Sequence, residues 1–140
     1  MFSVVSSNTQ PQHLELLREW CLAEWSKVDS FDCSDKGIAV PAPLVAVLDQ
    51  KLIGGLAFTS YPVPGNTNLG LWINAVIVAP EHRGKGVGSQ LIIAAESEAS
   101  SINATALFVY SSVLRLYQKH GWVELSSSGE SSVLKKVLSN

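Results

Sequence analysis

The spacing of apolar and polar residues along the chain predicts three helices. Between residues 14 and 28, apolar side chains recur every three or four positions, the pattern of a helix buried on one face. Asn8 or Thr9 could cap that helix, and Pro11 would fit its first turn. Residues 29–43 show no regular period and predict a short helix or a loop. Two further helical patterns cover about residues 89–100 and 113–120.

Seven shorter apolar segments predict strands, at residues 2–5, 44–48, 52–58, 69–78, 106–110, 122–125 and 133–138. Polar breaks at residues 49–51 and 126–129 are short enough for hairpins, which predicts antiparallel strand pairs. The passage from residue 71 to residue 110 is strand, helix, strand, which predicts one parallel pair with a right-handed crossover. We therefore expect an α/β (α+β) fold, a mixed central sheet of six or seven strands with helices on both faces.

Composition predicts one folded domain over residues 1–140 and excludes two function classes. Hydrophobic residues make up 46% of the chain and charged residues 16%, which is typical of a folded domain. The formal net charge of −2 gives no basic excess for binding nucleic acid. No residue from 52 to 80 is charged, but Pro62 and Pro64 divide this stretch into strand-length pieces. We therefore expect no membrane-spanning helix.

The number of cysteines and the first residues of the chain indicate in which cellular compartment the protein is expected. Cys21 and Cys33 are the two cysteines of the chain, too few for a disulfide framework. The first eight residues include no basic region and no extended apolar stretch, so no secretory signal is expected. Both observations favour a cytoplasmic protein.

The strongest chemical signal is the glycine-rich turn Arg83-Gly84-Lys85-Gly86-Val87-Gly88, between the strand at 69–78 and the helix at 89–100. Its glycines would let a phosphate approach backbone N–H groups, while the helix N-terminus and two cations supply positive charge. The turn therefore predicts a pyrophosphate site. A P-loop would need Ser or Thr after Lys85, and a dinucleotide fingerprint would need a different glycine spacing. An NTP-hydrolysing domain is excluded on the same grounds.

Arg83, Gly86 and Gly88 form the pattern Arg-x-x-Gly-x-Gly, which resembles the coenzyme motif of the GNAT superfamily of acetyl-CoA-dependent N-acetyltransferases. Three other segments also stand in the order and spacing of that family. They are the hairpin around residues 49–50, the Val-Ala-Pro at 78–80 and the Leu-Tyr-Gln-Lys-His-Gly-Trp at 116–122. The resemblance covers about residues 44–125, is closest to small bacterial-type members, and implies the GNAT fold.

The resemblance implies particular roles for residues of this chain. The pantetheine arm of acetyl-CoA would lie along the strand at Val76–Val78, which a bulge usually separates from the strand at 106–110. Tyr117 would protonate the departing thiolate and is the expected catalytic residue. The residues expected to bind the coenzyme are Val76, Ile77, Val78, Arg83, Gly84, Lys85, Gly86, Val87, Gly88 and Ser89.

The expected reaction is direct attack of a primary amine on acetyl-CoA in a ternary complex, with no metal. An alkylamine is mostly protonated at neutral pH, so a proton acceptor is needed. The strand at 69–78 has no Asp or Glu, although that strand often supplies the base in this family. Water, His82, Glu81 and His120 are the candidates for this role. Asn74 could orient a water molecule.

Some parts of the implied site stay open. Tyr110 stands where the family often has an asparagine, and Ser111 and Ser112 could take over its polar contacts. Neither cysteine lies in a segment expected to build the cleft, so a covalent protein intermediate is not expected. Trp72 and the loop at 61–68 could line the acceptor pocket. The tryptophans at positions 20 and 25 could belong to the core or to that pocket's wall.

The acceptor would be a small-molecule amine or an exposed peptide amino group. The alternative function is a regulatory module of the same fold that binds acyl-CoA and transfers nothing. The missing strand carboxylate favours the module, and Tyr117 favours the enzyme. The edge strand at 133–138 would allow a homodimer.

Overall fold

The computed structural model describes residues 2–24, 40–65 and 67–138. Its seven strands form one sheet in the order β1-β2-β3-β4-β5-β7-β6. The strands are β1 (Ser3–Ser6), β2 (Leu44–Leu48), β3 (Lys51–Pro62), β4 (Leu69–Val78), β5 (Ala106–Ser111), β6 (Val123–Ser128) and β7 (Ser131–Val137). The helices are α1 (Leu14–Glu24), α2 (Val87–Ser101) and α3 (Leu114–Gln118). Only β4 and β5 pair in parallel among these strands, which confirms the expected mixed sheet.

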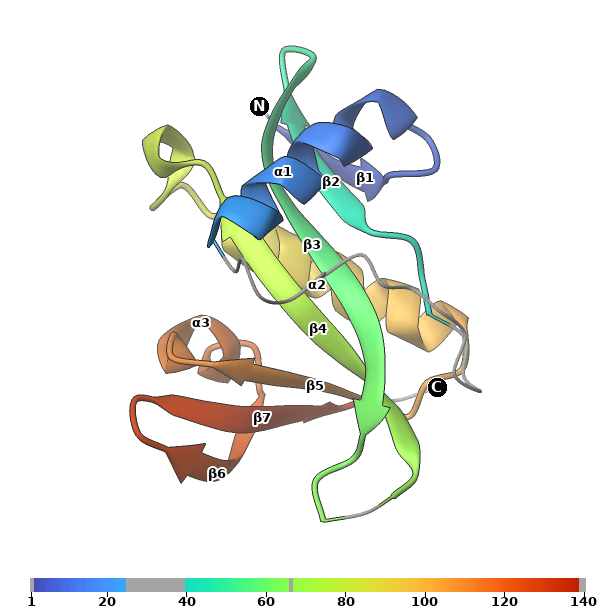
Figure 1. The fold of residues 1–140 in the computed structure, drawn as a ribbon, viewed down its shortest axis with the longest axis vertical. Coiled ribbons are helices and arrows are strands. Elements are labelled where there is room, and N and C mark those ends of the chain that lie inside the picture. Colours follow the sequence, from blue (N-terminus) through green and yellow to red (C-terminus); the bar gives the residue numbers. More distant parts are fainter. Residues whose placement is uncertain (1, 25–39, 66, 139–140) are drawn as a thin grey trace.

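The helices cover both faces of the sheet (Figure 1). On one face, Leu17 and Cys21 of α1 are buried against Val45, Val47 and Leu52. On the other face, α2 packs its apolar side against the larger core cluster. The stripe that the spacing predicted is therefore buried in α2, and in α1 it is buried at Leu17 and Cys21 within the described residues. None of the described helices combines the length and the hydrophobicity needed to cross a bilayer.

The first helix begins differently from the prediction. Pro11–His13 form a 3-10 turn, and α1 follows from Leu14. Capping by Asn8 or Thr9 was wrong, because the Thr9 hydroxyl donates to the Ser6 carbonyl at 2.8 Å. That bond belongs to the turn after β1, upstream of the helix. Trp25, Val28 and Cys33 lie outside the described residues, as does most of the segment predicted as a short helix or loop.

Two strands are longer than their apolar patterns indicate. β3 continues to Pro62, and β6 continues to Ser128, so the last turn falls at Gly129–Glu130 rather than at 126–129. The expected edge strand at 133–138 was wrong, because β7 pairs with both β5 and β6. β6 instead lies at the edge of the sheet, where one side faces solvent and serines replace apolar residues. The predicted hairpin after β2 is confirmed. Asp49 and Gln50 both have positive φ, as a tight two-residue turn requires.

The feature of the sheet that positions the site is an irregularity in β4. Its pairing with β3 shifts between Leu56↔Val76 and Phe58↔Ile73, which leaves one extra residue on β4. The pairing of β4 with β5 is limited to Trp72↔Phe108 and Ile73↔Val109. Beyond the bulge the two strands diverge, as the resemblance implied (Figure 1). Among the described residues, one edge of β4 is therefore without a strand partner at Val76–Val78.

Burial of the Cys21 thiol leads to a prediction about its reactivity. Burial raises the pKa of Cys21 from 9.0 to about 11. At pH 8 on the order of one thiol in 1,000 is then ionised, and the side chain is also shielded from reagents. In a Cys33→Ser variant, we expect an aromatic disulfide reagent to modify Cys21 at least about 100-fold more slowly in the folded protein than in denaturant. Equal rates would contradict the packing of α1.

Candidate functional site

A cavity of about 500 Å³ opens where β4 and β5 diverge. Three elements build it: the end of β4, the turn that leads into α2, and the α3 segment. A Cβ placed on Gly88 would lie 3.6 Å from Leu116 Cδ2 and 4.0 Å from Val78 Cγ2, so all three elements meet at Gly88. The lining residues are Val76, Ile77, Val78, His82, Arg83, Gly84, Gly86, Val87, Gly88, Ser89, Ser111, Val113, Leu116, Tyr117 and Lys119.

The backbone of β4 presents a free edge to this cavity. The Ala79 N–H donates to the Ile53 carbonyl at 2.9 Å, so the backbone of Ala79 faces β3. Backbone groups point alternately to the two sides of a strand, and those of Ile77 therefore also face β3. The N–H and C=O groups of Val76 and the N–H of Val78 face away from β3, into the gap left by β5, while the Val78 carbonyl accepts a hydrogen bond from Arg83 Nε. An extended ligand could pair with them as an added strand would.

The N-terminus of α2 lies at the other end of the cavity. Gly86 is its N-cap, with φ of 83°, and no side chain in the described part of the chain caps the helix. The first helical bond runs from Gln90 N–H to the Gly86 carbonyl at 3.1 Å. The amides of residues 86–89 have no intrahelical acceptor, because the first turn of a helix never supplies one. These donors and the positive end of the helix dipole make this corner suitable for an anion.

Several cationic side chains surround that corner, but they are not equivalent. Arg83 Nε donates to the Val78 carbonyl at 3.0 Å, which folds the side chain back across the turn. Lys85 is exposed and is not among the lining residues, so its predicted place at the coenzyme site stays a prediction. Lys119 and His82 do line the cavity. Lys119 was not among the residues expected at the site, although Leu116 and Lys119 are three positions apart and so share one helical face.

Tyr117 is a buried lining residue of the cavity. Its side chain is 3% exposed, and its ring meets the Trp122 ring edge to face, with centroids 5.2 Å apart and an interplanar angle of 67°. Burial raises the pKa of Tyr117 above its ordinary value, so the phenol stays protonated at neutral pH. A buried phenol held by a ring contact is a proton donor in a fixed place.

A second cavity of about 820 Å³ lies on the side of the sheet that α1 partly covers. It shares Val76, Ser111, Val113 and Tyr117 with the first cavity, so the two meet at Tyr117. Trp72 lines it, as predicted, and so does Tyr61, which belongs to β3 rather than to a loop. Its remaining lining residues are Thr59, Ile73, Asn74, Val109, Tyr110, Ser112, Ser131 and Val133.

The three titratable residues considered as the base lie in different places. His82 lines the first cavity beside the glycine turn. Glu81 is exposed on that turn and is not a lining residue. His120 lines neither cavity, and its Nε2 is buried without a hydrogen-bond partner in the described part of the chain. Of these three side chains, only His82 therefore borders the site.

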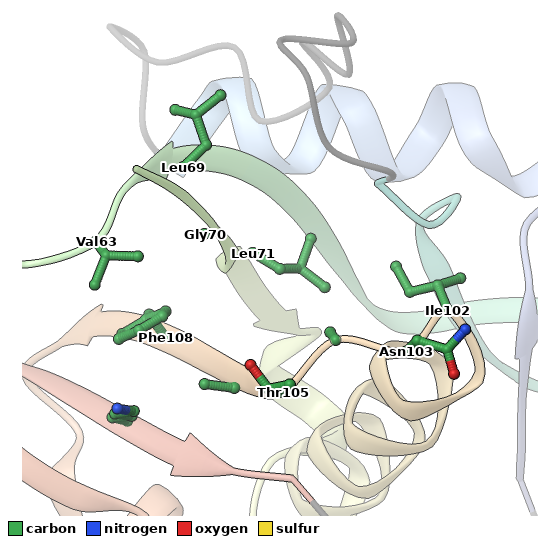
Figure 2. A pocket seen from close by; sticks show the side chains of 11 residues that line it. Val63, Leu69, Gly70, Leu71, Ile102, Asn103, Thr105 and Phe108 are labelled. Atoms are coloured by element: carbon green, nitrogen blue, oxygen red, sulfur yellow. The ribbon is translucent and has the colours of Figure 1, made fainter. Parts of the chain in front are cut away.

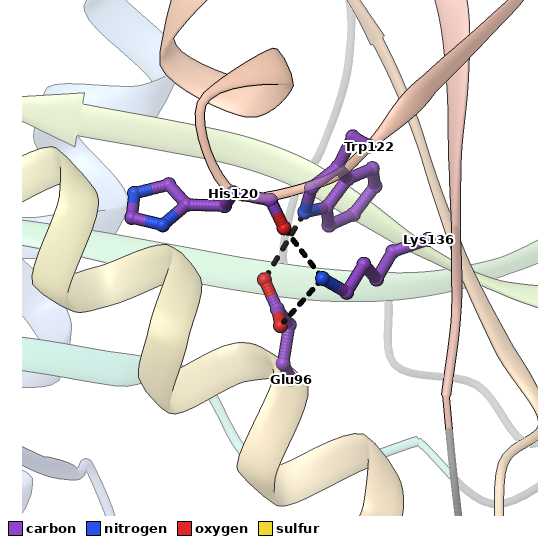
Figure 3. Close-up of polar contacts among 4 residues, drawn as sticks. All are labelled: Glu96, His120, Trp122 and Lys136. Carbon is purple, nitrogen blue, oxygen red and sulfur yellow. Dashed lines mark hydrogen bonds and ion pairs between the residues drawn. The ribbon is translucent and has the colours of Figure 1, made fainter.

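A polar cluster fixes the segment that follows Tyr117 (Figure 3). Glu96 of α2 accepts a hydrogen bond from Trp122 Nε1 at 3.1 Å. Its other carboxylate oxygen lies 3.7 Å from Lys136 Nζ, which also donates to the His120 carbonyl. The cluster joins α2, β7 and the turn between α3 and β6. It therefore holds Trp122 in place, and through it the ring of Tyr117.

We expect Glu96→Ala to lower the free energy of unfolding by about 1–3 kcal/mol, because it leaves the indole N–H of the buried Trp122 without its acceptor and removes the ion-pair partner of Lys136. Glu96→Gln keeps an acceptor oxygen for Trp122 and should cost less than the alanine variant. Urea unfolding of both variants against the wild type measures the difference. Equal costs, or no cost, would show that the cluster does not stabilise the fold.

A third cavity, of about 440 Å³, lies at the opposite ends of β4 and β5 (Figure 2). Val63, Leu69 and Leu71 border it on one side, and the turn at Ile102–Thr105 borders it on the other. Phe108 closes its inner end, with Lys135 Nζ 5.8 Å from the ring centroid. It shares no lining residue with the other two cavities in the described ranges, and the turn into α2 does not reach it.

The acetyltransferase (GNAT) family matches residues 11–122. The chain belongs to this family. It is therefore an acyltransferase of the GNAT type, and the resemblance drawn from the glycine turn and the segment at 116–122 is confirmed. A comparison with curated proteins found no matching sequence.

Solved structures show the same fold. A GNAT-family acetyltransferase from Streptococcus pneumoniae is 17% identical, with a TM-score of 0.67 over 99% of this chain and 100% of its own. The GNAT family N-acetyltransferase YhbS from Escherichia coli, in complex with CoA, is 20% identical, with a TM-score of 0.68 over 99% and 81%. The PaiA N-acetyltransferase from Thermoplasma acidophilum, in complex with coenzyme A, is 16% identical, with a TM-score of 0.64 over 98% and 99%.

Proposed function

We propose that this protein transfers the acetyl group of acetyl-CoA to a primary amine, by direct attack within a ternary complex. The observation that carries the proposal is that two cavities meet at Tyr117, one suited to the coenzyme and one open for an acceptor. Two of the similar structures are complexes with coenzyme A, which supports the same ligand here.

Acetyl-CoA fits the first cavity by its chemistry. The amides of residues 86–89 would hold the pyrophosphate, and Lys119 and Arg83 would add positive charge beside it. The backbone of Val76 and Val78 would pair with the two amides of the pantetheine arm. In this arrangement the thioester would lie near Tyr117, where β4 and the α3 segment meet.

The reaction then needs few groups from the protein. Acetyl-CoA supplies an activated acetyl thioester. The amine nitrogen forms a bond with the acetyl carbon, the carbon–sulfur bond breaks, and Tyr117 gives its proton to the leaving thiolate. A backbone N–H of β4 near Val78 that the pantetheine arm leaves unpaired would stabilise negative charge on the thioester oxygen. The proton of the amine leaves through water that Asn74 orients, and Tyr117 regains its own from solvent.

Thiol release tests the proposal. The protein is mixed with acetyl-CoA and a panel of primary amines and lysine peptides, and free CoA and acetylated product are measured together. We expect release that depends on both the protein and an amine, with one acetylated product per thiol. If acetyl-CoA binds but no amine raises release above background, transfer is contradicted and a binding module of the same fold becomes the better account.

A further inference from the structure

We propose that the second cavity selects a primary amine carried on an aromatic ring by a short linker. This inference rests on the proposed acetyl transfer and names the class of acceptor. It is drawn from the side chains around the cavity and from its position relative to Tyr117.

The second cavity is lined by residues of both β4 and β5, and it meets the coenzyme cavity at Val76 and Tyr117. A ligand held there would present one end to the thioester and keep its body over the sheet. The residues that contact this body therefore determine which amine is accepted.

Tyr61, Trp72 and Tyr110 form an aromatic wall of the cavity, and the contacts of Trp72 make part of this wall rigid. Trp72 is 8% exposed, and its Nε1 donates to the Tyr61 carbonyl at 3.1 Å. Its ring stacks on Phe108, with centroids 5.2 Å apart and an interplanar angle of 28°. It also meets the Tyr61 ring edge to face at 5.7 Å. Because these contacts fix the orientation of the rings, the wall is formed before a ligand arrives.

The two tyrosines of the aromatic wall are exposed to solvent. Tyr61 is 62% exposed and Tyr110 is 57% exposed, and both line the cavity from strands on its two sides. Large aromatic rings left open on a concave surface gain most by covering one another or a ligand ring. The same π faces attract an ammonium group on its way to the thioester.

The polar lining fits the same acceptor. Asn74 and the hydroxyls of Thr59, Ser111 and Ser112 lie among the rings. These neutral groups can bond a ring hydroxyl, a carbonyl or ordered water, and they can relay the proton that the amine loses. The described lining thus combines stacking surfaces with neutral hydrogen-bonding groups, which suits a planar ring better than a flexible polycation.

The test compares acceptors of similar size. Initial rates with 2-phenylethylamine, 2-cyclohexylethylamine and spermidine are measured at saturating acetyl-CoA. We expect kcat/KM for 2-phenylethylamine to exceed that for the other two by about tenfold, mainly through KM. A preference for spermidine, or equal values for the aromatic and cyclohexyl amines, would overturn the inference while leaving acetyl transfer intact.

Variants of the wall locate the effect. Tyr61→Ser and Tyr110→Ser remove exposed rings, so they should leave the fold intact, and we expect each to raise KM for 2-phenylethylamine about fivefold. Val123→Ser removes an exposed apolar side chain of β6 outside the cavity and should not change KM. A raised KM for 2-phenylethylamine in the Val123 variant, or an unchanged KM in both tyrosine variants, would contradict the assigned aromatic wall.

Equilibrium dialysis of 2-phenylethylamine against the CoA-loaded protein separates the two proposals. Binding that the tyrosine variants weaken, without any acetylated product, would support the acceptor class and contradict transfer. If the aromatic amine does not bind while another amine is acetylated, the acceptor class alone is wrong.

Discussion

Replacement of Gly86 by glutamate is expected to weaken acetyl-CoA binding by at least about 100-fold. Gly86 is the N-cap of α2, and its amide faces the corner where the pyrophosphate would lie. A carboxylate there meets negative charge at short range, which costs on the order of 3 kcal/mol at a half-exposed site, or about 100-fold in Kd. Calorimetric titration with acetyl-CoA measures both proteins directly.

The matched control is Gly65→Glu. Gly86 and Gly65 both have positive φ, 83° and 73°, and an added Cβ meets no atom within 4 Å at either position. The two substitutions therefore impose similar backbone strain, on the order of 1–2 kcal/mol. Gly65 lies in the loop between β3 and β4, away from the first cavity. Equal loss of affinity in both variants would show that strain, and not the anion site, was responsible.

Replacement of Tyr117 by phenylalanine is expected to lower kcat by about 100-fold or more while the Kd for acetyl-CoA stays nearly unchanged. The phenylalanine ring keeps the contact with Trp122, so the fold and the cavity are preserved. In the proposed reaction, the lost hydroxyl would be the group that gives its proton to the thiolate. Pre-steady-state measurement of thiol release, with urea unfolding as a check of the fold, separates chemistry from binding and stability.

The pH dependence gives a second readout for Tyr117. Burial raises its pKa above the ordinary 10.0, so the folded protein holds the phenolic proton more firmly than the unfolded chain. Ionisation of Tyr117 should therefore cause no loss of kcat below about pH 10. The contribution of the protonated phenol to the free energy of unfolding should decline only as the pH rises above that value. Wild-type turnover in the phenylalanine variant would contradict the assigned role.

The glycine turn and the order of the elements could be predicted because their signals are local. A strand, three closely spaced glycines and a helical period follow one another within residues 69–100, and each has its own spacing. The start of α2 at Val87, two residues before the helical period at 89, also has a local cause. Gly86 adopts a left-handed conformation, from which a helix can begin without a side-chain cap.

Contacts between distant segments could not be predicted in this way. Trp122 and Glu96 are 26 positions apart, and no periodicity shows which helix face meets which strand. Tyr61 was assigned to a loop because Pro62 and Pro64 suggest one, whereas pairing with Gly70 keeps it in β3. That pairing is what brings its ring to Trp72. Lys119 was missed for a similar reason, since its place beside the cavity depends on how α3 packs against α2.

The most direct test of the central claim is an amide NMR titration of the nitrogen-15-labelled protein with acetyl-CoA. The account predicts saturable shifts at one equivalent, largest at residues 84–89 and at Val76 and Val78, whose amides face the first cavity. Smaller changes should follow at Tyr117. If the largest shifts fall at the turn Ile102–Thr105 of the third cavity, or if no saturable shift occurs, the claim that acetyl-CoA binds in the first cavity is contradicted.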